Sequence, residues 1–176
     1  MDLVSGDALT ASQGEESSEM QKNNLGSMVW YETQFMSAAA DTEFSIAFER
    51  AEDDNAPDSR VSLPAPFDLT VPAPDEEFFM SVDRISVAWN NTSDDVMKLT
   101  VSGSCFFGIS EELNTDEGVY VIEPTVLEPI DAGANETCVA TVSLTREREG
   151  SVDAAFGEGG VFAGRQSRSV EILVRP

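Results

Sequence analysis

The sequence predicts an all-β protein, built as an antiparallel sandwich or a single jelly-roll barrel with an N-terminal arm. From residue 44 onwards, apolar and polar residues alternate in short runs, which is typical of half-buried strands. Turn-forming residues separate these runs at intervals of about ten residues, as in sandwiches and jelly rolls. No convincing helical pattern follows residue 40, which argues against alternating strands and helices. We therefore expect an arm over residues 1–40 and one β domain over residues 41–176.

The predicted arm begins with a polar segment and ends with a short apolar one. Residues 1–26 are small, polar and acidic, so we expect disorder unless a partner such as a neighbouring subunit holds them. The arm should therefore serve assembly and not folding. Residues 27–40 fit helical and strand spacing almost equally well. We expect this apolar element to pack on its own core, with docking on a partner or a lipid surface as the alternative. The residues able to anchor such a contact are Met28, Trp30, Tyr31, Phe35 and Met36.

The β domain opens with two alternating runs. Phe44, Ile46 and Phe48 alternate with smaller residues, and a charged loop follows over residues 52–58. Alternation returns over residues 67–71, where the flanking prolines suit the ends and edges of strands. Both runs predict strands with one buried face, because successive side chains of a strand point to opposite faces.

The remaining strands are predicted from the same pattern. Over residues 78–89 the inward face switches near Asp83 and Arg84, as a β-bulge would cause. Turn-forming residues at 114–118 and 131–135 separate the later strands. Those strands are expected at residues 96–107, 119–122, 125–130, 137–144 and 169–174, with weaker candidates near residues 61–63, 152–156 and 161–163.

Charge is the most informative part of the composition. The 176 residues include 33 Asp and Glu, 10 Lys and Arg and no His, which gives a net charge of −23. Such a charge excludes an electrostatic grip of the whole chain on DNA, RNA or anionic lipid. It also opposes a compact fold in dilute buffer, whereas at about 1 M salt the Debye length is about 3 Å and the repulsion is screened.

The few basic residues are mostly arginine, since Lys22 and Lys98 are the two lysines of the chain. An acidic, Lys-poor chain that keeps Arg resembles the proteins of salt-in halophilic archaea. An ordinary acidic protein, or one with a calcium-loaded surface, is the alternative. The acids are spread along the whole chain, which favours a solvated surface over a single ion site.

The sequence contains no recognisable catalytic motif. We therefore predict that the protein is not an enzyme and needs no cofactor. Without His, Ser-His-Asp and Cys-His arrangements are impossible within the chain. The glycine-rich residues 157–164 lack the Lys-Ser/Thr ending of a phosphate-binding loop. Acidic loops at residues 53–58, 75–77 and 94–95 offer oxygen ligands for calcium. None has a calcium-loop pattern, so we expect solvated loops and no metal site.

Cys105 and Cys138 lie in two predicted strands. Two cysteines without His cannot form a structural zinc site. The first 26 residues show no secretory signal, which indicates synthesis in a reducing compartment. We therefore expect two buried free thiols, with one inter-strand disulfide as the alternative.

Several other residues have structural interpretations. Trp30, Trp89 and the ten Phe supply the large apolar side chains that a core needs. Residues 146–149 alternate Arg with Glu and are expected to form a solvated hairpin end or a subunit contact. Sequons for N-glycosylation begin at Asn90, Asn91 and Asn135.

In length, acidic composition, polar arm and strand pattern over residues 44–176, the chain resembles a known family. The family comprises the single-jelly-roll major capsid proteins of halophilic archaeal viruses that enclose an internal membrane. The resemblance involves no diagnostic motif and transfers no functional residue. It implies a capsid subunit, made in the host cytoplasm and located in the virion. Such subunits assemble with one another and with a second capsid protein over a lipid vesicle, and we expect neither direct nucleic-acid binding nor a small-molecule substrate.

A non-catalytic β-sandwich binding or adhesion module of a halophile fits the strand pattern equally well. Residues 127–137 resemble turns in immunoglobulin-like domains. The missing export signal argues against this alternative. An intracellular enzyme is the third hypothesis.

Overall fold

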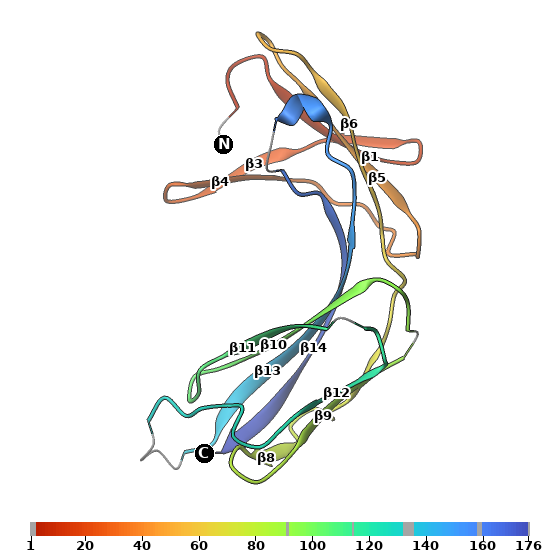
Figure 1. Cartoon of the computed structure of the whole chain (residues 1–176). Coiled ribbons are helices and arrows are strands. Elements are labelled where there is room, and N and C mark those ends of the chain that lie inside the picture. The colour runs from red at the N-terminus through yellow and green to blue at the C-terminus, as the bar shows by residue number, and fades with distance from the viewer. Residues whose placement is uncertain (1–2, 91, 114, 132–135, 158–159, 176) are drawn as a thin grey trace. The chain divides into compact units, whose positions relative to one another are not determined.

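The structure is a computed structural model that describes residues 3–90, 92–113, 115–131, 136–157 and 160–175 (Figure 1). These residues form fourteen strands and one short 3₁₀ helix, so the predicted all-β class is confirmed. The chain divides into two compact units. The N-terminal unit contains Met1–Pro64 and Arg148–Gly164, and the C-terminal unit contains Ala65–Glu147 and Arg165–Pro176. This division differs from the expected boundary between residues 40 and 41.

The N-terminal unit contains a four-stranded sheet and a two-stranded ribbon. The sheet has the order β2-β1-β5-β6 with antiparallel pairing, and β3 pairs antiparallel with β4 to form the ribbon (Figure 1). The strands are β1 (Ala8–Gln13), β2 (Glu16–Glu19), β3 (Gln21–Leu25), β4 (Met28–Glu32), β5 (Glu43–Glu49) and β6 (Ala56–Ser62).

The polar N-terminal segment is ordered by its own chain. Every residue of β1 pairs with a residue of β5, from Ala8 with Glu49 to Gln13 with Phe44. The partner that holds this segment is therefore a strand of the same unit. Within the expected arm, β1 and β2 belong to the four-stranded sheet, and β3 and β4 form the ribbon. Of the two periodicities proposed for residues 27–40, strand spacing is correct for Met28–Glu32.

The predicted alternation in β5 creates the buried face of this sheet. Directly paired residues on neighbouring strands lie on the same face. Leu9, Phe48 and Ala56 form one such row across β1, β5 and β6, and Ala11, Ile46 and Ser59 form the next. In these rows Phe48, Ala56, Ala11 and Ser59 are buried, whereas Leu9 and Ile46 remain partly accessible.

The C-terminal unit is a sandwich of two sheets. One sheet has the order β11-β10-β13-β14-β8 and the other has the order β12-β9-β7. Strand β8 runs parallel to β14, whereas β10 pairs antiparallel with β11 and β13, and β9 pairs antiparallel with β12 and β7. The strands are β7 (Leu69–Val71), β8 (Glu77–Phe79), β9 (Ile85–Trp89), β10 (Val96–Gly103), β11 (Ile109–Leu113), β12 (Val119–Ile122), β13 (Cys138–Glu149) and β14 (Ala163–Arg175).

The two sheets draw their strands from along the whole unit, so the chain crosses between the sheets several times. The first, third and sixth strands of the unit form one sheet, and the others form the second. The face switch predicted as a bulge near Asp83 and Arg84 has another cause, because the chain leaves β8 in one sheet and enters β9 in the other. The expected strand over residues 125–130 is wrong, since these residues contain one isolated bridge, between Pro129 and Phe106.

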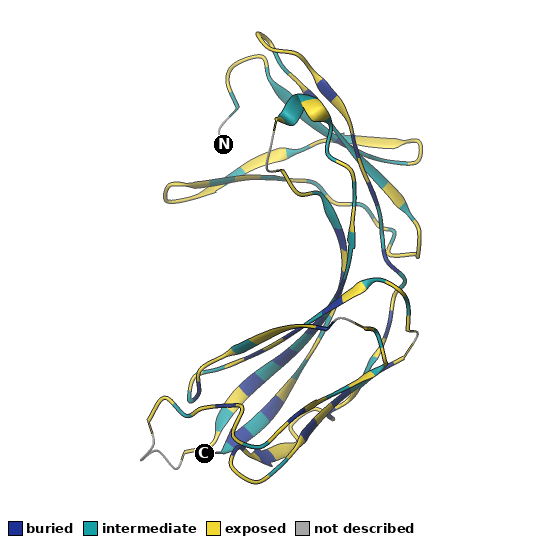
Figure 2. Ribbon diagram, viewed as in Figure 1, coloured by how far each residue is buried: buried dark blue, intermediate teal, exposed yellow. Residues whose placement is uncertain are grey.

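Inward-facing residues of both sheets build one hydrophobic core in this unit. Buried positions alternate with partly or fully exposed ones along β10, along most of β13 and near both ends of β14 (Figure 2). Trp89 is buried as predicted, but Trp30, Phe79 and Phe107 are exposed, so the assignment of all large aromatic residues to the core is wrong. The principal core residues are Phe67, Val87, Trp89, Leu99, Val101, Phe106, Val142, Leu144, Ile172 and Val174.

Two predictions about polar and sulfur chemistry are also wrong. Cys105 and Cys138 form a disulfide, with their Cα atoms 6.0 Å apart, and are not free thiols. Arg146 was expected at a solvated strand end, yet its side chain is fully buried in an ion pair with Asp116. The inward face of β13 continues through Arg146, because its side chain has a buried carboxylate as partner.

Candidate functional site in the N-terminal unit

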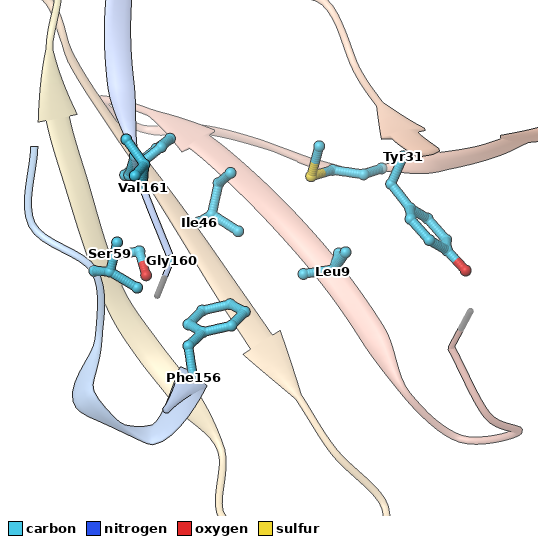
Figure 3. A pocket seen from close by; sticks show the side chains of 10 residues that line it. Leu9, Tyr31, Ile46, Ser59, Phe156, Gly160 and Val161 are labelled. Atoms are coloured by element: carbon cyan, nitrogen blue, oxygen red, sulfur yellow. The ribbon is translucent and has the colours of Figure 1, made fainter. Parts of the chain in front are cut away.

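An apolar pocket of about 300 Å³ lies in the N-terminal unit (Figure 3). Its floor comes from the buried face of the sheet, where Leu9 of β1, Ile46 of β5 and Ser59 of β6 contribute side chains. Leu9 and Ile46 belong to neighbouring rows of that face. Because these two side chains are only partly covered, the sheet leaves apolar surface open to a ligand.

The ribbon forms a second side of the pocket. Tyr31 of β4 and Met20, which precedes β3, line it. The Tyr31 hydroxyl accepts a hydrogen bond from the backbone N–H of Leu3 at 3.0 Å, and the Met20 N–H donates to the Leu9 carbonyl oxygen at 2.8 Å. These bonds join both residues to the segment that begins the sheet, so the ribbon side is held in place.

The segment that follows β13 closes the third side through Val152, Phe156 and Val161. Phe156 ends the 3₁₀ helix η1 (Ala154–Phe156) and stacks on Phe48, with ring centroids 5.6 Å apart. The Arg50 guanidinium lies 4.6 Å from the Phe48 ring centroid and donates to the Ala155 carbonyl oxygen at 3.0 Å. Phe156 is therefore held by ring stacking and by a cation beside it.

Asp153 attaches this segment to the edge of the sheet. Its carboxylate accepts hydrogen bonds from the N–H groups of Asp58 and Ala155, both at 2.9 Å. The Asp153 N–H donates to the Ser59 hydroxyl at 3.0 Å. Charged and polar groups near the pocket are thus engaged with the backbone, which leaves its lining apolar.

The lining suits an apolar guest and offers little for acid–base chemistry. None of the residues that line the pocket is a carboxylic acid, a lysine or an arginine. Ser59 and Tyr31 supply its hydroxyl groups, and both accept the hydrogen bonds described above. The arrangement can hold an aliphatic or aromatic group by burial alone.

The ribbon divides the predicted contact residues between its two faces. Tyr31 and Val29 share the face toward the pocket, whereas Met28 and Trp30 share the opposite face with Leu25. On that outer face Leu25, Met28 and Trp30 are 74%, 66% and 39% exposed. Strand parity explains the split, because neighbouring side chains point to opposite faces.

The other two predicted contact residues follow the ribbon. Phe35 packs edge-on against Phe44 at a centroid distance of 5.7 Å, so it belongs to the unit's own packing. Met36 is 99% exposed. The structure therefore brings Tyr31 to the pocket and leaves Met28, Trp30 and Met36 on the surface.

Sequence reasoning missed most of the pocket. Ile46 was placed on a buried strand face, but Leu9 was assigned to a disordered segment and Phe156 to a weak strand candidate. More than a hundred positions separate Ile46 from Phe156, as in the Arg50–Ala155 hydrogen bond, which spans 105 positions. The one local signal was that the apolar residues Leu9 and Ala11 alternate with the polar residues Thr10 and Ser12, as in a strand with one buried face.

The other candidate sites from the sequence are the acidic loops and the glycosylation sequons. In the described part of the chain, no group of three or more His, Cys, Asp or Glu side chains is arranged to hold a metal ion. Asn90 exchanges two hydrogen bonds with Asp68, at 2.7 and 3.0 Å, so the amide of this sequon is engaged. The sequon residues Asn91 and Asn135 lie outside the described residues.

No family model and no curated protein sequence matches the chain. Within the residues described, no helix is both long enough and apolar enough to cross a membrane.

Proposed function

We propose that the protein is a non-catalytic β-sandwich binding module, working at high salt, whose N-terminal unit holds an apolar side chain of a protein partner. The observation that carries this proposal is the apolar pocket between the sheet, the ribbon and residues 152–157 and 160–162. Its volume of about 300 Å³ is at the low end for ligand pockets, which suits one or two side chains better than a large molecule.

Two further features support a binding module. The C-terminal unit is a sandwich of two sheets, an architecture that many cell-surface domains share. The Cys105–Cys138 disulfide favours an oxidising location, because such bonds are rare where thiols are kept reduced. The fold itself supports many functions, so the pocket carries more weight than the sandwich architecture.

The second candidate function is a capsid subunit that assembles into an icosahedral virion shell over an internal membrane. The exposed apolar residues of the ribbon favour this candidate, since subunit contacts need such surface. The disulfide supports the binding module instead. Purification of the chain at high salt separates the two functions, because a capsid subunit would form closed particles.

A fluorescent probe tests the proposed function. N-phenyl-1-naphthylamine, a neutral apolar dye, should bind the full chain saturably at about 2 M salt, where charge repulsion is screened. Val161→Trp should weaken this binding at least about tenfold by filling the pocket mouth. Val82→Trp is the matched control, because Val161 and Val82 are 74% and 71% exposed and Val82 lies in the C-terminal unit. Absence of saturable binding, or equal binding by both variants, would contradict the proposal.

A further inference from the structure

We infer that the protein partner is a second copy of this chain, which inserts the tip of its β3–β4 ribbon into the pocket. This inference rests on the proposed function and names the occupant of the same site. The tip is defined by Leu25 and Met28, which pair directly across the turn at residues 26–27. Trp30 lies next to Met28 on the same face.

The tip is an apolar knob that the described residues of its own unit leave largely exposed. Leu25 and Met28 are 74% and 66% exposed, and both belong to the outer face of the ribbon. The inner face is already used, because Tyr31 lines the pocket of the same molecule. A ribbon cannot turn both faces toward one pocket, so the outer face is available to another molecule.

Charge complementarity favours this occupant. The N-terminal unit contains sixteen Asp and Glu and four Lys and Arg. Residues 20–31 contain Lys22 and no acid, which makes them the longest acid-free stretch of the unit. A second acidic copy therefore repels the ribbon less than it repels the rest of this acidic unit. The positive charge of Lys22 also favours contact with an acidic copy.

The two surfaces are different patches of one molecule, so the contact is heterologous. Each copy offers one knob and one pocket, and a head-to-tail series forms either a ring or an open filament. Screening by salt should strengthen the association, because the net charge of −23 on each copy opposes it in dilute buffer. The same contact serves a homotypic adhesion module or a shell protein.

Sedimentation equilibrium of the full chain at about 2 M salt tests the inference. The wild-type protein should show a mass that rises with concentration. Leu25→Ser with Met28→Ser removes the knob, Val161→Trp fills the pocket, and each variant alone should be monomeric. A mixture of the two variants should form a dimer and nothing larger, because one supplies an intact pocket and the other an intact knob.

The control is Val82→Ser, which removes an equally exposed valine from the C-terminal unit and should associate like wild type. Circular dichroism and dye binding check that the knob variant keeps its fold and its pocket. If the dye binds while wild type stays monomeric, or the knob variant associates like wild type, or the mixture stays monomeric, the inference is overturned and the proposed function stands. If the dye does not bind, both are overturned.

Discussion

The Arg146 guanidinium donates a hydrogen bond to the Asp116 carboxylate at 2.8 Å, and neither side chain is exposed to solvent. Asp116 also accepts hydrogen bonds from the Trp89 indole N–H at 2.5 Å and the Ser93 N–H at 2.9 Å. Arg146 donates to the Ala65 carbonyl oxygen at 2.7 Å. The pair therefore joins β13 to three loop or strand-end segments of the C-terminal unit.

Arg146→Met should lower the free energy of unfolding of this unit by about 3–5 kcal/mol, because it leaves the Asp116 carboxylate buried without a cation. Adding Asp116→Asn should recover part of that loss. Urea unfolding followed by Trp89 fluorescence measures both. Arg84→Met, at an exposed ion pair with Glu123 of the same unit, is the control and should cost less than about 1 kcal/mol. Equal losses for the buried and the exposed arginine would contradict the prediction.

The disulfide should stabilise the C-terminal unit. It closes a loop with a sequence separation of 33 residues, and chain entropy assigns about 3–4 kcal/mol to a loop of that length. Cys105→Ser with Cys138→Ser should lower the free energy of unfolding by this amount, and wild type unfolded with a reducing agent should behave like the variant. Denatured, unreduced protein should take up no thiol reagent, so labelling of both cysteines would show that the bridge is absent.

The fold should depend on salt. The C-terminal unit carries seventeen Asp and Glu against six Lys and Arg, and the N-terminal unit is also strongly acidic. Lowering salt from about 3 M to about 0.1 M lengthens the screening distance from a few Å to about 10 Å, which restores repulsion within each unit. Circular dichroism should lose β signal over this range. An unchanged spectrum and particle size at low salt would remove the salt-adapted interpretation.

Stability should fall in acid partly through Glu147. Hydrogen bonding to Arg165 at 2.5 Å, helped by Lys98 at 3.1 Å, holds the pKa of Glu147 below its ordinary value, although partial burial opposes the shift. A carboxylate with a lowered pKa in the folded state stabilises the fold above its unfolded pKa of about 4.3 and loses that effect as pH falls through the folded pKa.

Glu147→Gln should therefore destabilise the protein at neutral pH and flatten the dependence of stability on pH below about 4.3. Urea unfolding at fixed salt, from neutral pH into acid, measures the difference between wild type and variant. Glu123→Gln, at an ion pair of the same unit in which both side chains are more than half exposed, is the control. A wild-type-minus-variant difference that stays constant with pH would contradict this assignment.

Deleting residues 1–26 should unfold the N-terminal unit and spare the C-terminal one. The deletion removes β1, β2 and β3, which exposes the edge of β5 and leaves β4 without its partner. The C-terminal unit keeps its own hydrophobic core. Limited proteolysis should then cut within residues 43–62 and leave residues 85–113 protected. Protection of both segments would show that β1 is dispensable.

Much of the sandwich could be predicted from the sequence, because its strands alternate locally. The run from Val96 to Gly103 shows this pattern without knowledge of partners. Arg146 could not be assigned in the same way, because its burial depends on Asp116, thirty positions earlier. From sequence alone, a charged side chain is predicted to be exposed to solvent, unless its buried partner is known.

The N-terminal unit was less predictable for a related reason. The strand Ala8–Gln13 has small and polar residues, and its order comes from hydrogen bonds to β5 rather than from its own apolar content. Free thiols were expected because no secretory signal was found, whereas the fold brings the Cα atoms of Cys105 and Cys138 to 6.0 Å, a distance that a disulfide can span. In both cases the deciding contact is distant in sequence.

The interleaved composition of the two units has a consequence for synthesis on the ribosome. Met1–Pro64 emerges first, but its unit also needs Arg148–Gly164, which follows the first part of the other unit. The C-terminal unit in turn needs residues from Arg165 onwards. Ordinary tandem domains fold one after another as they emerge, N-terminal first. Here a nascent chain that has reached residue 147 carries two unfinished units. The N-terminal unit becomes complete at Gly164, and the C-terminal unit becomes complete only when the rest of β14 is made.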